Sequence, residues 1–97
     1  MNVVFREEAL TDLEEIADYI AKQNPVAAAR VLARIHRVIY RTIRTLPLGG
    51  RLNPLNNTRE YSVLGLPYLV IYLPSADSID IIGVFHTARD PATKPPP

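Results

Sequence analysis

Apolar positions in the first half of the chain recur every three or four residues, which is the spacing of amphipathic helices. In residues 7–23 these positions are Ala9, Leu10, Leu13, Ile16, Ala17 and Ile20. In residues 25–46 they are Ala28, Leu32, Ile35, Ile39, Ile43 and Leu46, with Val31 and Val38 widening the apolar face. Between the two segments, Asn24 and Pro25 are typical of an N-cap followed by proline in the first helical turn. The pattern predicts a helical hairpin with a very short connection.

The remaining apolar runs are rich in β-branched and aromatic residues and are separated by turn residues, which is typical of strands. Four strands are predicted, at residues 2–5, 59–63, 68–73 and 79–85. Gly65 and Pro67 mark one tight turn between them, and residues 74–78 mark another. We therefore expect an antiparallel arrangement for the last three strands.

These elements predict an α+β fold with the order β-α-α-β-β-β. The helical hairpin of residues 7–46 is expected to cover one face of an antiparallel-dominated sheet. Residues 48–57 contain Gly, Asn and Pro and are predicted to form a loop. We expect a single domain over residues 1–91, followed by a proline-rich flexible tail at residues 92–97.

Length and composition narrow the class of protein. At 97 residues the chain has room for one domain, and without cysteine it has neither a disulfide framework nor a thiolate metal site. His36 and His86 lack the spacing of metal ligands, so no metal or other cofactor is expected. The chain starts without a signal-peptide pattern, and no apolar run approaches the roughly 18 residues that span a bilayer. A soluble, cytoplasmic protein without membrane contacts is expected.

The net charge is only +1, but the charges are strongly segregated along the chain. Six acids lie in the first fifth, whereas residues 26–46 contain no acid and five arginines: Arg30, Arg34, Arg37, Arg41 and Arg44. On an ideal helix these arginines fall within an arc of about 80° opposite the apolar stripe. One interpretation is a solvated outer face, and the other is a binding face for an acidic partner. The low net charge favours a protein partner over nucleic acid.

A second group of polar residues lies on the strands and at the exit of the last one. His86, Arg89 and Asp90 follow the last predicted strand, while Arg59 and Tyr61 alternate on an earlier strand and so share a face. His86 and Arg89 have the chemistry of a general base and an anion-holding cation. The alternative is that His86 hydrogen-bonds at the sheet edge and Arg89 is solvated. Because no acid–base pair is completed nearby in sequence, no catalytic residue is predicted.

Several short motifs occur in a characteristic order over nearly the whole chain. They are AxxDLxxIxxYI from Ala9, NPxAA from Asn24, REYxV from Arg59, PYLVIY from Pro67 and VFHTARDP from Val84. In this order and spacing the chain resembles the RelE/ParE toxin superfamily of type II toxin-antitoxin modules. Its last segment resembles the ParE, or plasmid-stabilisation, branch. The resemblance implies a toxin made beside an antitoxin, with a two-helix hairpin against an antiparallel sheet.

The superfamily includes RelE-type ribonucleases, which cut messenger RNA on the ribosome with lysines on one strand and an arginine in a YRxxY strand. They also use an arginine at the end of the last strand and a tyrosine in a C-terminal helix. Here Leu69 stands at the YRxxY arginine position, Glu60 and Ser62 stand in place of the lysines, and Thr87 lies near the place of the last arginine. No C-terminal helix is predicted. RNA cleavage needs a base and cations that stabilise developing charge. The resemblance therefore implies a ParE-like toxin that arrests growth by binding DNA gyrase without catalysis.

The expected partners are a cognate ParD-like antitoxin and DNA gyrase, with no sequence-specific nucleic acid binding by the toxin alone. The candidate antitoxin-binding residues are the five arginines named above. The candidate target-binding residues are Arg59, Tyr61, His86, Arg89 and Asp90. Two alternatives stay open. One is a RelE-like endoribonuclease in which Arg59, Tyr61, His86 and Arg89 replace the missing residues, and the other is a non-toxic homologue that only binds antitoxin.

Overall fold

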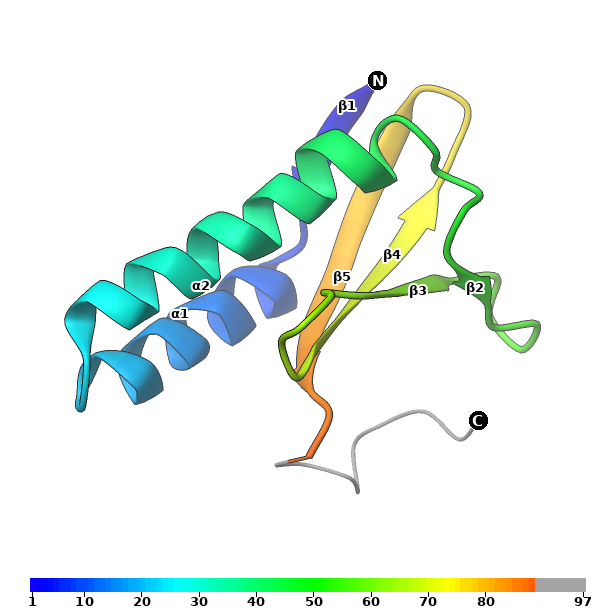
Figure 1. The fold of residues 1–97 in the computed structure, drawn as a ribbon. Coiled ribbons are helices and arrows are strands. Elements are labelled where there is room, and N and C mark those ends of the chain that lie inside the picture. Colours follow the sequence, from blue (N-terminus) through cyan, green and yellow to red (C-terminus); the bar gives the residue numbers. More distant parts are fainter. Residues whose placement is uncertain (89–97) are drawn as a thin grey trace.

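The computed structural model describes residues 1–88, so the end of the predicted domain and the predicted tail lie outside the described residues. The elements are β1 (Asn2–Phe5), α1 (Glu7–Ala21), α2 (Pro25–Arg37), η1 (Val38–Ile43), β2 (Arg51–Leu52), β3 (Arg59–Ser62), β4 (Tyr68–Pro74) and β5 (Ser78–His86). Figure 1 shows that α1 and α2 lie side by side on one face of the sheet. This confirms the α+β fold and the helical hairpin.

The sheet has five strands in the order β1-β5-β4-β3-β2. All neighbouring pairs are antiparallel except β1 and β5, which are parallel. After β1 the helical hairpin carries the chain to the opposite edge of the sheet, where β2 lies. The register of β4 and β5 shifts so that Ile71 pairs with Gly83 and Tyr72 pairs with Ile81. Ile82 is therefore an extra residue in β5, which is the signature of a β-bulge.

One strand lies inside the segment that the sequence predicts to be a loop. Arg51 and Leu52 form β2 and pair with Glu60 and Arg59 of β3. The element order is thus β-α-α-β-β-β-β, with one more strand than predicted. A two-residue strand has too short a pattern to recognise in sequence, because it is defined by its pairing rather than by its own alternation.

The start of α2 follows from Asn24 and Pro25 as predicted. The Asn24 Oδ1 atom accepts a hydrogen bond of 3.1 Å from the Ala27 backbone N–H, and Pro25 occupies the first turn, where its missing N–H leaves no gap. Leu10 and Leu46, which the periodic pattern includes among the apolar positions of the two helices, are more than half exposed and do not belong to the core. Leu10 lies at the margin of the α1 apolar stripe, and Leu46 follows the last helical turn.

The second helix does not remain an α-helix to residue 46. Beyond Arg37 it continues as the π-helix η1, in which the Arg44 N–H donates to the Ile39 carbonyl. In an α-helix of 3.6 residues per turn, residues four positions apart are rotated about 40° from each other around the helix axis. The rotation per residue is smaller in the wider π-helix, so residues four positions apart stay closer to one face. The change keeps Ile35, Ile39 and Ile43 on one face, and all three are fully buried.

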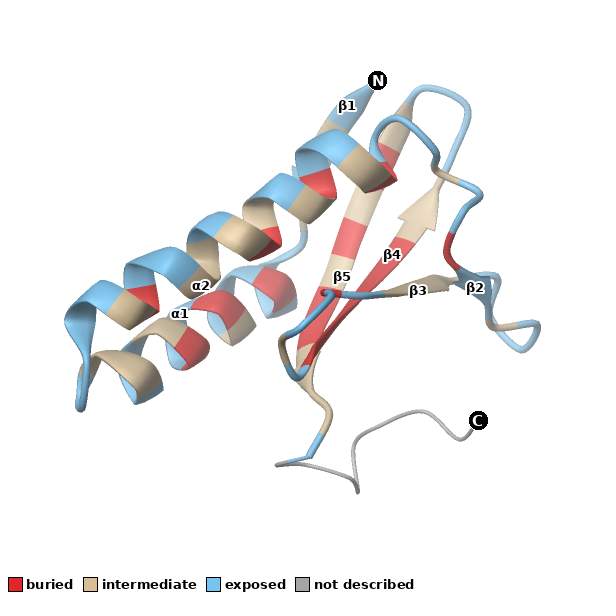
Figure 2. Cartoon of the chain, in the orientation of Figure 1, coloured by how far each residue is buried: buried red, intermediate tan, exposed pale blue. Residues whose placement is uncertain are grey.

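The core lies between the helical hairpin and the sheet (Figure 2). Ala9, Leu13 and Ile16 of α1 belong to it, together with the helix-facing residues of β4 and β5. Within residues 1–88 no helix has the length and apolar character needed to cross a membrane.

Candidate functional site

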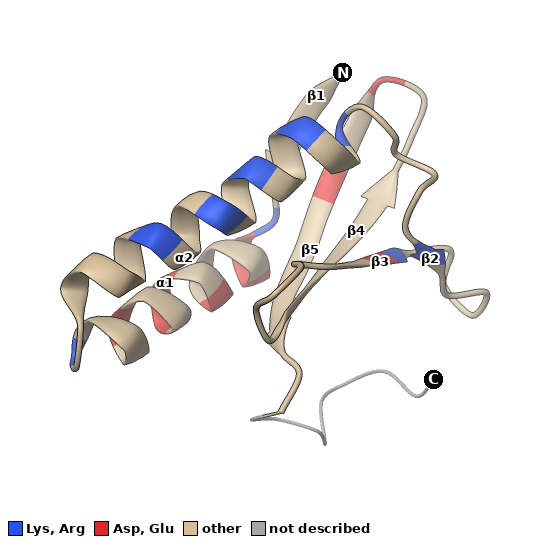
Figure 3. Ribbon diagram, in the orientation of Figure 1, with Lys and Arg blue, Asp and Glu red and all other residues tan. Residues whose placement is uncertain are grey.

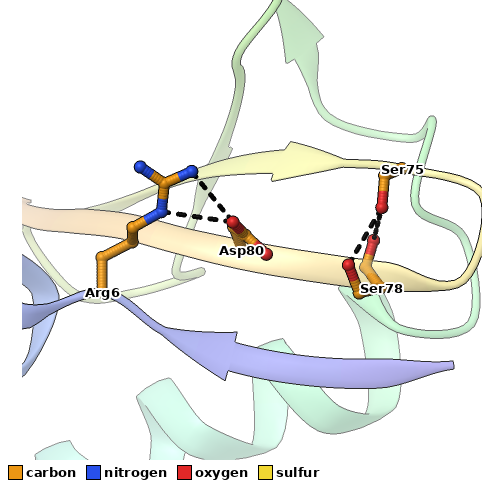
Figure 4. A network of polar contacts seen from close by, with 4 residues as sticks. All are labelled: Arg6, Ser75, Ser78 and Asp80. Carbon is orange, nitrogen blue, oxygen red and sulfur yellow. Dashed lines mark hydrogen bonds and ion pairs between the residues drawn. The ribbon is translucent and has the colours of Figure 1, made fainter.

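The arginine side chains of α2 and η1 form a surface that has no ion-pair partner among residues 1–88. Arg30, Arg37 and Arg41 are exposed, and we call these three residues the arginine stripe. Figure 3 shows basic residues along α2 and acidic residues along α1. Among residues 1–88 the single ion pair is elsewhere, between the Arg6 guanidinium and the Asp80 carboxylate, with contacts of 2.9 and 3.2 Å (Figure 4). The positive charge of the stripe is therefore available to a partner.

The five predicted arginines differ in their contacts. Arg34 is half-buried and its guanidinium donates to the Leu64 carbonyl, which ties α2 to the turn between β3 and β4. Arg44 is exposed, and its guanidinium carbon lies 5.8 Å from the centre of the Tyr40 ring. Arg34 and Arg44 thus contact other parts of the chain, whereas the three residues of the arginine stripe are exposed.

An aromatic cluster adjoins Arg44 where η1 passes over β1. The His36 and Tyr40 rings are stacked with centroids 6.4 Å apart, and Phe5 lies 5.8 Å from His36 and 6.3 Å from Tyr40. His36 Nδ1 lies 2.8 Å from the Leu32 carbonyl oxygen, to which it donates. His36 thus has a packing role on α2.

Arg59 and Tyr72 hold the backbone of the segment that follows η1. The Tyr72 hydroxyl accepts from the Gly50 N–H at 3.0 Å and donates to the Pro47 carbonyl at 2.9 Å. One guanidinium nitrogen of Arg59 donates to the carbonyls of Leu48 and Gly50 at 3.0 and 2.9 Å. Burial raises the pKa of Tyr72, although its bond from Gly50 and the nearby Arg59 oppose the shift. Arg59 is therefore occupied by structural bonds in the unbound chain.

Tyr61 and His86 are half-buried rather than fully exposed. Tyr61 pairs with Val70 and packs against the core. The His86 ring meets Tyr68 edge-on with centroids 5.3 Å apart, and its Nδ1 accepts from the Ala88 N–H at 3.3 Å. The predicted partners Arg89 and Asp90 lie outside the described residues.

Asp12 of α1 is one of the six acids in the first fifth of the chain, and the sequence did not single it out. Its carboxylate accepts a 2.9 Å hydrogen bond from the Val84 N–H, beyond the point where β1 stops pairing with β5. Burial raises the pKa of Asp12, repulsion from Glu15 and Glu8 adds to this, and the Val84 bond opposes it. Asp12 borders the apolar stripe of Ala9, Leu13 and Ile16 on a helical wheel, which is the signal that could have revealed its role.

The described residues offer charged contact surfaces and little catalytic chemistry. Asp12 and Tyr72, whose pKa values are raised, both use their oxygens in structural hydrogen bonds. Leu69, at the position compared with the RelE-type arginine, is buried. Within residues 1–88 no three His, Cys, Asp or Glu side chains gather in a way that could hold a metal ion.

A family model described as the ParE toxin of the type II toxin-antitoxin system parDE matches residues 3–91. The chain belongs to the ParE toxin family. It is 40% identical over 78 residues to the candidate toxin Y4kP of Sinorhizobium fredii, which covers 80% of this chain and 79% of Y4kP. It is also 32% identical over 87 residues to toxin RelE2 of Caulobacter vibrioides, covering 90% of this chain and 96% of RelE2.

A solved structure of the chromosomal ParDE toxin-antitoxin system from P. aeruginosa has the same fold. The TM-score is 0.75 at 18% sequence identity, and the match covers 89% of this chain and 95% of that chain. This likeness agrees with the arrangement of two helices on a mostly antiparallel sheet. The family match and the two relatives confirm the RelE/ParE resemblance of the sequence motifs.

Proposed function

We propose that this ParE-family toxin is bound and neutralised by a ParD-like antitoxin that contacts the arginine stripe. The observation that carries the proposal is the charge distribution of residues 19–59, which contain no acid. Eight of the chain's 11 Lys and Arg lie there: Lys22, Arg30, Arg34, Arg37, Arg41, Arg44, Arg51 and Arg59. Like charges on one helix face repel each other, and an acidic partner relieves that repulsion.

Charge reversal of the arginine stripe is expected to weaken antitoxin binding strongly. The variant combines Arg30→Glu, Arg37→Glu and Arg41→Glu, and it leaves Arg34 intact because that residue bonds to the Leu64 carbonyl. Like-charge contacts across an interface cost several kcal/mol, so the Kd should rise at least about 100-fold. Calorimetric titration with the small protein encoded beside the gene measures the change.

The matched control is the neutral triple variant with Gln at the same three positions. It should give an intermediate Kd and a weaker dependence on salt, because attraction is removed without adding repulsion. If the Glu variant binds with wild-type affinity and unchanged salt dependence, the arginines form a solvated helix face and do not bind the antitoxin.

For the cellular target, we propose DNA gyrase, contacted by the strand-end residues His86, Arg89 and Asp90 together with Tyr61. A protein poison needs complementary contacts to one state of its target and no tuned acid–base pair. That requirement fits a chain with Leu69, Glu60 and Ser62 at positions where RelE-type ribonucleases have cations. Arg59 is the weaker candidate because its guanidinium already binds two backbone carbonyls.

The purified toxin is expected to inhibit DNA supercoiling by gyrase and to increase the amount of cleaved DNA. Arg89→Ala should reduce the inhibition while circular dichroism stays that of the wild type. His86→Ala should reduce it as well, with some loss of stability because the His86 ring packs against Tyr68 at the end of β5. Plasmid relaxation gels give the measurement. Full supercoiling in the presence of excess folded toxin would contradict gyrase as the target and indicate a different one.

A second candidate function is ribosome-dependent cleavage of messenger RNA, favoured by the 32% identity to a relative named RelE2. In that case Arg59, Tyr61, His86 and Arg89 would have to hold and activate the RNA. Primer extension on messages from induced cells separates the two functions. Cuts at codon positions within translated regions support the ribonuclease, and their absence together with supercoiling inhibition supports the gyrase poison.

A further inference from the structure

The segment after η1 exposes four leucines within ten residues. Leu46, Leu48, Leu52 and Leu55 are 64%, 69%, 46% and 85% exposed. We call residues 46–55 the leucine loop, and Figure 2 shows most of it as exposed, from the end of η1 to the edge strand β2. Scattered single leucines are ordinary on a surface, whereas several on one segment indicate a contact site.

The backbone of the leucine loop is fixed by polar bonds rather than by burial of its leucines. Tyr72 and Arg59 bind three carbonyls and one N–H of its first half, as described above. In the second half, the Asn53 side chain accepts from the Leu55 N–H at 3.0 Å, and the Asn53 N–H donates to the Thr58 carbonyl at 2.8 Å. Fixing a loop before binding lowers the entropy lost on association. The exposed leucines are thus presented on a preorganised backbone.

Charge narrows the kind of partner that fits this loop. Arg44 precedes the leucine loop and Arg51 lies within it, and the loop itself contains no acid. Glu60 stands opposite Arg51 in the pairing of β2 and β3, but no ion pair joins them among residues 1–88. A second copy of this chain would bring like charges together at the same surface. Nucleic acid would pair with the arginines but would leave the leucines without apolar contacts. An acidic segment with an apolar face can pair with the arginines and also cover the leucines.

We propose that the leucine loop is the second half of the antitoxin-binding surface. An acidic amphipathic segment places carboxylates over Arg37 and Arg41 and continues past η1, where its apolar side chains cover Leu48 and Leu55. This inference rests on the proposed neutralisation by an antitoxin and adds a surface that the charge pattern alone did not identify. The apolar half supplies contacts that salt does not weaken.

The test compares Leu48→Ser combined with Leu55→Ser against the control Leu64→Ser. Leu64 is 85% exposed like Leu55, but it lies on the turn between β3 and β4, outside the acid-free segment. The probe is the purified protein encoded beside the gene, titrated at low and high salt. Loss of two buried interface leucines should raise the Kd at least about tenfold at both salt concentrations. The control should bind like the wild type, and all three proteins should unfold at the same temperature.

Other outcomes overturn the inference. If the wild type binds the probe and the double variant binds equally well, the leucine loop is not part of the surface and the proposed neutralisation stands. The inference is equally wrong if Leu64→Ser raises the Kd as much as the double variant does. It is also wrong if the double variant binds the probe normally but no longer arrests growth, since the leucine loop would then contact the target. A wild-type toxin that does not bind the probe contradicts the proposed function itself.

Discussion

Gly50→Ala is expected to destabilise the folded chain by about 3 kcal/mol, since overpacking costs about 1–3 kcal/mol and each lost hydrogen bond about 1 kcal/mol. Gly50 is buried, and an added Cβ would collide with the Tyr72 hydroxyl and lie 2.9 Å from the Glu60 carbonyl oxygen. Displacing the hydroxyl breaks its bonds to both Gly50 and Pro47. For a domain of this size the melting temperature should fall by more than about 12 °C.

Two variants separate the collision from the loss of hydrogen bonds. At Gly49 an added Cβ would lie 3.2 Å from the nearest atom, the Leu46 carbonyl oxygen, so Gly49→Ala should lose less than half as much stability. Tyr72→Phe removes the hydroxyl without adding volume and should lose about 1–2 kcal/mol. Equal melting temperatures for Gly50→Ala and Gly49→Ala would refute the assigned role of the Tyr72 anchor.

The second large effect is expected at Asp12 and depends on pH. Asp12→Ala removes the acceptor of the Val84 N–H and should reduce the free energy of unfolding by about 1–2 kcal/mol at pH 7. Asp12→Asn keeps an oxygen acceptor and removes the carboxylate that burial disfavours. The Asn variant should therefore be at least as stable as the wild type at pH 7. Denaturant unfolding of the three proteins at several pH values makes the comparison.

The sign of the pH dependence follows from the raised pKa of Asp12. The folded chain binds this proton more tightly than the unfolded chain does. The part of the stability that comes from protonation of Asp12 is therefore fully present below its ordinary pKa and is lost as the pH rises through the raised value, whereas the oxygen acceptor for the Val84 N–H is retained in both protonation states. The advantage of Asp12→Asn over the wild type should grow across that interval and then level off. A difference that stays constant with pH would mean that Asp12 is solvated in solution.

The helix pattern could be predicted because local signals and tertiary packing agree. Asn24 caps the backbone of its own helix, and the three- and four-residue spacing of Ala9, Leu13 and Ile16 corresponds to a buried face. The change to a π-helix could not be predicted, because it depends on how Ile39 and Ile43 meet a sheet built from later residues.

The polar anchors escaped sequence reasoning for a related reason. Asp12 bonds to Val84, which is 72 positions away, and the hydroxyl of Tyr72 bonds to backbone groups at positions 47 and 50. An isolated sequence shows that such a side chain is polar, but not which backbone group the fold brings to it. Arg59 illustrates the consequence, because a cation that suggested target binding proves to hold the leucine loop. The arginine stripe remained visible because it depends only on the helical period.

Growth after induction of this chain, with and without the small protein encoded beside it, tests neutralisation by an antitoxin most directly. A ParE-family toxin neutralised by an antitoxin predicts growth arrest when the chain is induced alone. It also predicts recovery on co-expression of the wild-type neighbour, and failure of that recovery for toxin carrying the Glu triple at the arginine stripe. Normal growth with abundant folded chain and no neighbour would contradict the account, as would arrest that the neighbour cannot relieve.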